Sequence, residues 1–233
     1  MQKIKVIIPC WLINEDLITL TKSAVDSLGD CDLIIIDNGS PLGGGYLRSV
    51  ADIYIRNKEN LGYAKAVNQG LRLCDKGELV AISNNDIRVS PNWQEISSSI
   101  LKDPKIGSVH FRMLPYDQPF APGNDTWTSG KERWCTSSFF VVRNVQSYDE
   151  NYLNNCDDWD FWKRMREQGY TTAYTNQAEY QHKDSFTQQL VAERSENDKK
   201  SREYFKSKWG LSPEEDFERS FPGELAKQWR PFP

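Results

Sequence analysis

Residues 3–40 read KIKVIIPCWLINEDLITLTKSAVDSLGDCDLIIIDNGS, and this stretch predicts the fold. Two apolar runs, KIKVIIP and DLIIID, flank a segment with the features of a helix, because Asn14 suits an N-cap and Gly29 a C-terminal stop. Neither run alternates apolar with polar residues, which is typical of strands covered on both faces. A strand, a helix and a second strand in this order predict a parallel pair joined by a right-handed crossover.

The same alternation continues along the chain. The runs DIYIR, ELVAIS and IGSVHF predict further strands, and GYAKAVNQGLRLC and SPNWQEISSSILKD predict helices. In the last of these we expect Ser90 to cap the helix and Pro91 to take its first position. The pattern predicts an α/β fold with a mostly parallel central sheet and helices on both faces.

Composition narrows the class of protein. A chain of 233 residues can form one domain with a tail, and a net charge of −4 without a basic cluster disfavours a nucleic-acid partner. No apolar run approaches 18 residues and the N-terminus lacks a signal-peptide pattern, so we expect a soluble cytoplasmic protein, with peripheral membrane association left open. The five cysteines show no C-x-x-C or zinc spacing, which predicts reduced, mostly packed thiols.

Polar residues follow the ends of the predicted strands, where α/β sheets bind ligands. Pro9, Asp37 and Asp86 should therefore lie along one rim. Asp37 could accept a hydrogen bond from a nucleotide base, and Asn84-Asn85-Asp86 offers oxygen ligands for a divalent cation that also touches phosphates. Taken alone, DNGS is also good turn chemistry and NND a common loop sequence. No G-x-G-x-x-G follows the first strand and no P-loop occurs, so dinucleotide and P-loop chemistry are disfavoured.

Three carboxylates crowd the start of one predicted helix. The segment CDDWDFWKRMREQGY predicts a helix that begins near Asp157 or Asp158 and stops at Gly169. One aspartate would suffice to cap the helix and complement its dipole. Because Asp160 is a third, we expect at least one of them to face a ligand.

The segments VIIPCW, IIIDNGS, NKENLGYAKAVNQGL, AISNND, CDDWDFWKRMREQGY and QHKDS, in this order, resemble glycosyltransferase family 2 from about Lys3 to about Ser185. The resemblance implies the GT-A fold and an inverting hexosyl- or deoxyhexosyltransferase. The implied donor is a UDP- or dTDP-sugar and the implied acceptor a glycan hydroxyl, as in polysaccharide or glycoconjugate synthesis. The domain is expected over residues 1–186. Residues 187–233 are expected to form a charged helix and tail docked on the domain through Leu190, Tyr204, Phe205 and Trp209.

The resemblance also assigns the metal and donor residues. Asp86 becomes the main carboxylate ligand of Mn²⁺ or Mg²⁺, with Asn84 standing where the family more often has Asp. On its own a lone histidine is more often packed than a ligand; the resemblance makes His182 the residue that completes the metal site. Residues of the implied donor pocket are Pro9, Asp37 at the base, Asn60, Gly62, Tyr63 and Asn68, with Asn84 and Asn85 at the ribose and diphosphate.

On the acceptor side the resemblance implies a catalytic role for Asp158, the general base that deprotonates the acceptor hydroxyl. Asp157 stands where Glu is more usual, and Asp160 is expected to orient the acceptor or cap the helix. Trp127 and Trp134 are candidate acceptor contacts, although core positions are equally compatible with the sequence. The alternative function is a catalytically silent module that binds nucleotide sugars or glycans; the presence of both Asp86 and Asp158 favours the enzyme.

Overall fold

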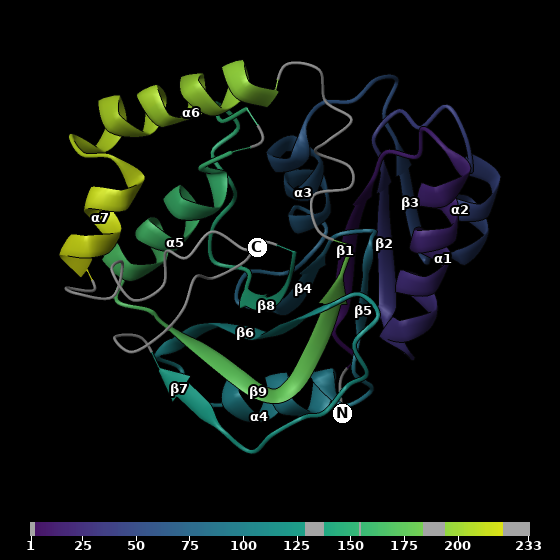
Figure 1. Cartoon of the computed structure of the whole chain (residues 1–233), viewed down its shortest axis with the longest axis horizontal. Helices are drawn as coiled ribbons and strands as arrows, with labels where there is room; N and C mark the ends of the chain where they lie inside the picture. The colour runs from purple at the N-terminus through teal and green to yellow at the C-terminus, as the bar shows by residue number, and fades with distance from the viewer. Residues whose placement is uncertain (1–2, 129–137, 154, 184–193, 221–233) are drawn as a thin grey trace.

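The computed structural model describes residues 3–128, 138–153, 155–183 and 194–220. Its centre is a nine-stranded sheet with the order β3-β2-β1-β4-β8-β6-β9-β5, and β7 pairs with β9 (Figure 1). The strands are β1 (Lys5–Cys10), β2 (Asp32–Asp37), β3 (Ile53–Arg56), β4 (Leu79–Ser83), β5 (Ile87–Val89), β6 (Ile106–Pro115), β7 (Thr126–Thr128), β8 (Phe139–Arg143) and β9 (Thr171–His182). The helices are α1 (Glu15–Leu28), α2 (Gly44–Val50), α3 (Tyr63–Leu71), α4 (Trp93–Ile100), α5 (Asp157–Glu167), α6 (Arg194–Trp209) and α7 (Pro213–Ser220).

Strand directions follow from the pairings. β1 pairs in parallel with β2 and β4, β2 with β3, and β6 with β9. β8 is antiparallel to both β4 and β6, and β5 and β7 are antiparallel to β9. Six of the described strands, β1–β4, β6 and β9, therefore share one direction, which confirms the α/β fold with a mostly parallel sheet.

Alternate residues of the strands feed two cores on opposite faces of the sheet. Ile8 of β1 points to the core that α1, α2 and α4 cover, whereas Ile7 points to the core that α3 and α5 cover. The approach of α3 to β1 is close, because a Cβ added at Gly70 would lie 2.6 Å from the Ile7 side chain. Figure 1 shows α1 and α2 beside β2 and β3, with α5, α6 and α7 at the other end of the molecule.

Two helix starts test the capping expectations. The Asn14 side chain accepts a 2.9 Å hydrogen bond from the N–H of Leu17, so Asn14 is the N-cap of α1 as predicted. The prediction for Ser90 is wrong, because α4 begins at Trp93 with Asn92 as its N-cap. The Ser90 hydroxyl instead accepts from the N–H of Glu179 and so ties this turn to β9. Its partner lies in a distant strand, which local sequence does not show.

The C-terminal helices pack against α5. Phe205 of α6 is fully buried in a small cluster with Tyr152 and Cys156, and Trp209 packs at its edge. Leu190 lies outside the described residues. No helix in the described part of the chain combines the length and the apolar character that a membrane span requires.

Candidate active site

Asp86 and His182 meet at the carboxyl end of β4, although they are far apart in the sequence. Asp86 precedes β5, whose first residue Ile87 pairs with His182 at the end of β9. Asp86 Oδ1 lies 3.2 Å from His182 Nε2, and the two side chains are only 4% and 8% exposed. The N–H of Lys183 also donates to the Asp86 carbonyl over 3.0 Å. The structure thus brings together the two residues predicted to hold a metal.

The two asparagines before Asp86 face different ways. The backbone N–H of Asn84 donates to the Ser138 carbonyl over 2.7 Å, and the Asn84 side chain is partly exposed. The Asn85 side chain is buried and donates to the Thr21 hydroxyl of α1 over 3.1 Å. Asn85 was predicted to bind the donor; it lies in the turn between β4 and β5, and its amide donates to α1.

The chemistry at Asp86 fits a divalent cation. Its 3.2 Å contact with His182 is not aligned as a hydrogen bond, and Asp86 Oδ1 is a buried oxygen that has no hydrogen-bond donor among the described residues. Those residues contain no group of three or more His, Cys, Asp or Glu side chains that could hold a metal. The described chain therefore offers two ligands here, and Mg²⁺-type sites commonly fill their other positions with waters and substrate phosphates.

Asp37, at the end of β2, is fully buried, and both of its carboxylate oxygens accept hydrogen bonds. Its Oδ1 accepts from the N–H of Ser40 over 2.8 Å, and its Oδ2 accepts from the Tyr54 hydroxyl over 2.6 Å and from the Arg56 guanidinium. Pro9 lies partly exposed on the neighbouring strand β1. Because Oδ1 accepts one bond, it keeps one acceptor position that a base could use.

A network of amides supports the loop before α3, and sequence reasoning found only part of it. The Asn38 side chain donates to Asn60 Oδ1 over 2.7 Å and accepts from Asn57 Nδ2 over 3.0 Å. Asn57 and Gln69 exchange two amide hydrogen bonds of 2.8 Å. Asn60 Oδ1 also accepts from the N–H of Gly62, which has a positive φ of 86°. The clustering of Asn in DNGS and NKEN was the available signal for the missed members.

Asn68 has a different place from the one predicted. Its amide donates to the Tyr148 carbonyl over 3.0 Å and to Glu150 over 2.9 Å, and it accepts from the N–H of Tyr148 over 2.8 Å. Asn68 is 2% exposed, and its hydrogen bonds join α3 to the segment before α5. Tyr63, at the start of α3, packs edge-on against Tyr148 with ring centroids 5.9 Å apart.

The start of α5 carries two neighbouring carboxylates, Asp157 and Asp158, that have no cation beside them among the described residues, and the residue before them has an unusual backbone conformation. Its N-cap, Cys156, has a φ of 60° and makes no side-chain cap, and it is the only described residue other than glycine with a positive φ. Asp157 is buried, and its Oδ2 has no hydrogen-bond partner among the described residues. Asp158 Oδ1 accepts from the N–H of Trp159 over 2.9 Å.

Burial, followed by the charge of Asp157, raises the pKa of Asp158 to about 7. Burial, followed by the charge of Asp160, raises the pKa of Asp157 to about 6. The two groups titrate as a pair, and the pair can hold a proton near neutral pH. Burial and the charges of both aspartates also raise the pKa of Tyr63 far above its ordinary value. The first residue of α3 therefore lies in the electrostatic range of the α5 carboxylates.

Asp160 was predicted to orient an acceptor or to cap α5; in the structure its side chain pairs with donors of α5 and α6 and does not cap α5. Its Oδ1 accepts from Trp209 Nε1 over 2.9 Å and lies 2.7 Å from Lys208 Nζ. Its Oδ2 accepts from Arg164 Nε over 2.7 Å. The side chain is fully buried, and two of these donors come from α6. Asp160 joins α5 to α6.

Of the two tryptophans predicted to contact the acceptor, the structure describes Trp127. Trp127 lies in β7 and packs on Tyr174 of β9 with ring centroids 5.6 Å apart. Trp134 lies outside the described residues.

A sequence profile described as Glycosyl transferase family 2 matches residues 5–140, more than half of the chain. The chain belongs to glycosyl transferase family 2. Comparison with curated proteins gave no match. The matched segment of this family 2 chain includes Asp37 and Asp86. It ends before Asp158 and His182, so the evidence for these two residues is their geometry and the resemblance of their motifs.

Solved structures confirm the GT-A fold of the family 2 chain. Staphylococcus aureus TarS, residues 1–349, has a TM-score of 0.62 at 13% identity and covers 98% of this chain and 78% of its own. The same fragment in complex with UDP has a TM-score of 0.61 at 12% identity, with the same coverage. GalNAc-T7 with UDP, GalNAc and Mn²⁺ has a TM-score of 0.61 at 12% identity and covers 77% of this chain and 43% of its own. At these identities the likeness establishes the fold.

Proposed function

We propose that this glycosyltransferase moves a sugar, with inversion, from a UDP- or dTDP-sugar to a glycan hydroxyl and that it uses Mn²⁺ or Mg²⁺. The observation that carries the proposal is the Asp157–Asp158 pair, which has no cation beside it among the described residues, whereas the buried Asp37, Asp160 and Asp216 are each ion-paired. Membership of family 2 supports glycosyl transfer. TarS crystallised with UDP-GlcNAc and GalNAc-T7 crystallised with UDP and Mn²⁺ support the class of donor and cation.

At the base end, the open acceptor position on Asp37 Oδ1 suits the N3–H of uracil or thymine, which cytosine lacks. Arg56 and Tyr54 fix the carboxylate that would make this contact. At the diphosphate end, Asp86 and His182 are the residues that would hold the cation. When bound, the cation would balance the negative charge that develops on the leaving diphosphate.

Asp158 is the proposed general base. Because its pKa is raised to about 7, the carboxylate can be ionised at neutral pH and still take a proton from the acceptor hydroxyl as that hydroxyl attacks. Attack from the face opposite the leaving group gives inversion in one displacement. Asp157 raises the proton affinity of Asp158 through its charge, and the start of α5 holds both carboxylates.

A donor-hydrolysis screen tests the proposal. Nucleotide sugars with uridine, thymidine, cytidine and guanosine bases are compared with Mn²⁺, with Mg²⁺ and with EDTA, and donor binding is measured by calorimetry. We expect turnover of uridine or thymidine donors, lost in EDTA and lost in Asp86→Ala. The control is Glu95→Ala, which removes an exposed carboxylate from α4.

Three outcomes contradict parts of the proposal. Unchanged donor affinity in EDTA would remove the metal assignment, and equal competition by all four nucleoside diphosphates would remove Asp37 as a base contact. Tight donor or glycan binding with no hydrolysis and no transfer to any glycan would favour a silent binding module.

A further inference from the structure

Asp160 is a fully buried carboxylate on the same first turn of α5 as the proposed base, and two of its partners come from the distant helix α6. Trp209 Nε1 donates to Oδ1 over 2.9 Å, and Lys208 Nζ lies 2.7 Å from the same oxygen. Both partners lie at the end of α6, which β9 and a connecting segment separate from Asp160 along the chain. The start of α5 is thus tied to a helix outside the segment that the family 2 profile matches.

The end of α6 is itself anchored to the loop that precedes α5. Lys208 Nζ also lies 2.7 Å from Asp149, and the Tyr204 hydroxyl donates to Asp149 over 3.0 Å. Although burial alone would raise it, hydrogen bonds from Lys208, Asn151 and Tyr204 lower the pKa of Asp149 to about 2. Lys208 therefore bridges two carboxylates, one in the loop and one in α5.

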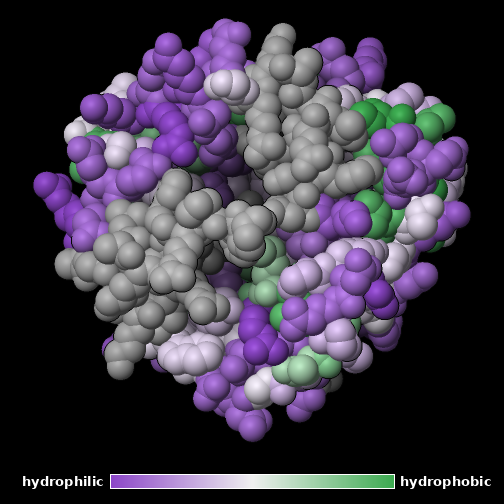
Figure 2. Space-filling view, in the orientation of Figure 1, coloured by the Kyte–Doolittle hydropathy of each residue, from purple (hydrophilic) through white to green (hydrophobic). Residues whose placement is uncertain are grey.

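The next helix holds the middle and end of α5. Asp216 of α7 accepts from Lys163 over 2.8 Å and from Arg166 over 2.6 Å. Figure 1 shows α6 and α7 lying next to α5, and Figure 2 shows hydrophilic side chains covering the outer surface where α6 lies. The polar contacts of these helices with the rest of the domain are therefore concentrated on α5 and its preceding loop.

The first turn of α5 needs such external support. Its N-cap Cys156 makes no side-chain cap and has a left-handed φ. The capping bonds come instead from the carboxylates of the turn, as where Asp158 Oδ1 accepts from the N–H of Trp159. Three aspartates repel one another there, and a buried charge such as Asp160 is tolerated only when it is paired. Lys208, Trp209 and Arg164 supply that pairing without touching Asp157 or Asp158 in any contact that the structure records.

We infer that Lys208 and Trp209 are positioning residues for glycosyl transfer: through Asp160 they fix the first turn of α5 and the carboxylate pair on it. The C-terminal helices then complete the active site, beyond any role in stability. The inference rests on the proposed function, in which Asp158 is the base.

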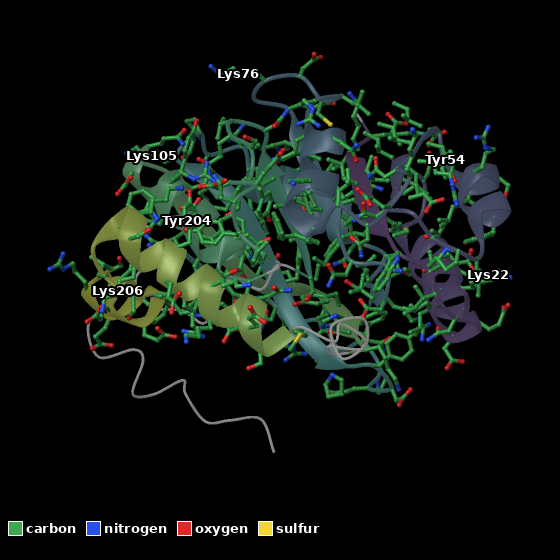
Figure 3. All side chains as sticks on the ribbon, turned by 90° about the horizontal axis from the view of Figure 1, so that it is seen from above. Lys22, Tyr54, Lys76, Lys105, Tyr204 and Lys206 are labelled. Carbon is green, nitrogen blue, oxygen red and sulfur yellow. The ribbon has the colours of Figure 1, made fainter. Side chains whose placement is uncertain are left out.

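Two variants remove the contacts with little change of shape. Trp209→Phe removes the Nε1 donor and keeps an aromatic ring beside Phe205. Lys208→Met removes the cation and keeps the apolar stem. The matched control is Lys206→Met, which removes the same charge from an exposed position on the same helix (Figure 3). All variants are made in the full chain, with thermal melts to show that each is folded.

The first readout is the titration of the pair by NMR with ¹³C-labelled aspartate. The Asp158 signal is assigned by its loss in Asp158→Asn. Titratable groups that act on the pair are Tyr63, Tyr148 and Asp160, and those that act on its N-cap are Asp198 and Arg202. Arg164, Tyr152 and Lys208 act through their contacts with Asp160. Because Lys208→Met leaves the Asp160 charge less compensated, it should raise the apparent pKa values of the pair by about 0.5.

The second readout is hydrolysis of UDP-GlcNAc with Mn²⁺. In Trp209→Phe and Lys208→Met we expect kcat to fall about 10-fold with the donor KM within about twofold, because a displaced base slows the chemical step and leaves donor binding intact. Lys206→Met should match the wild type in both readouts.

The outcomes separate this inference from the proposed function. If the Asp157 and Asp158 titrations in both variants coincide with those of Lys206→Met, the positioning role is wrong, whatever the activity. If UDP-GlcNAc is hydrolysed and kcat matches the control, the inference is also overturned. An Asp158→Asn protein with full activity would instead overturn the base assignment, and the altered titrations would still show the coupling between α6 and α5.

Discussion

Buried aspartates at the two ends of the molecule differ in their partners. At the end of β2, Asp37 is fully buried and has Arg56, Tyr54 and a backbone N–H as partners. At the start of α5, the Asp157–Asp158 pair has no ion-pair partner among the described residues. Figure 3 shows Tyr54 and Tyr204 on opposite sides of the molecule, so the two arrangements are separate.

The contrast shows that the partners of a buried carboxylate, and not burial alone, decide its proton affinity. A carboxylate with a cation and hydrogen bonds stays ionised and holds neighbouring groups in place. A carboxylate that is desolvated beside another acid binds protons near neutral pH, which suits proton transfer and costs stability. In their partners, Asp37 and Asp160 are alike, because each is ion-paired with an arginine, whereas Asp158, two residues from Asp160, has no ion-pair partner among the described residues.

The largest effect is expected at the uncompensated pair. Asp158→Asn keeps the size of the side chain and cannot take a proton from an acceptor hydroxyl, so single-turnover transfer should fall by about 10²-fold or more. Donor affinity measured by calorimetry should change little, because the variant leaves Asp37, Asp86 and His182 intact.

The control for that measurement is Asp157→Asn, which keeps the proposed base and removes its charged neighbour. We expect it to retain more activity than Asp158→Asn and to shift the pH–rate profile to lower pH, because the charge of Asp157 raises the pKa of Asp158. A near wild-type rate for Asp158→Asn, with Asp157→Asn inactive, would exchange the two roles.

A smaller effect, on stability and not on catalysis, is expected at the ion-paired Asp37. Asp37→Asn should lower the free energy of unfolding by about 2 kcal/mol, because it breaks charge-assisted bonds that Arg56 and Tyr54 make to a buried carboxylate. Urea unfolding measures the change, with the exposed Glu59→Gln as the control. In a double-mutant cycle, Arg56→Met should cost much less in the Asp37→Asn background than in the wild type. Equal costs in both backgrounds would show that the ion pair contributes nothing.

The sequence predicted the parts of the site that depend on strand ends. Asp37 follows an apolar strand, Asp86 follows another, and His182 ends a third, so topology alone brings Asp86 and His182 into contact. The helix start at Asp157 was equally visible, because three acidic residues precede an apolar helical face. In each case the informative feature is local in the chain.

The failures concern side chains whose partners are distant. Asn68 bonds the backbone of Tyr148, Asn85 bonds Thr21 of α1, and Asp160 bonds the end of α6. Nothing in the flanking residues distinguishes a polar side chain that awaits a ligand from one that a remote segment will satisfy. The family resemblance assigned Asp160 a role from its position in the motif. That position does not reveal the contacts of Asp160 with Lys208 and Trp209 of α6.

The smallest expected effect is the pH dependence of stability, and it follows from the sign of the pKa changes. The pKa values of Asp157 and Asp158 rise to about 6 and about 7 on folding, so the folded protein binds more protons than the unfolded chain between about pH 4 and pH 7. The pair's contribution to stability is therefore fully present below about pH 4 and is lost as the pH rises through 6 to 7.

Asp158→Asn removes one titrating group, so its free energy of unfolding should fall less between pH 5 and pH 8. At pH 8 the variant should be the more stable protein by on the order of 1 kcal/mol. Urea unfolding at a series of pH values measures both curves. Asp37→Asn, which we expect to be less stable than the wild type, is the reference for an aspartate that is ion-paired. If Asp158→Asn is instead less stable at pH 8 by the amount typical of a lost helix cap, Asp158 serves α5 as a structural residue and the contrast between the two ends disappears.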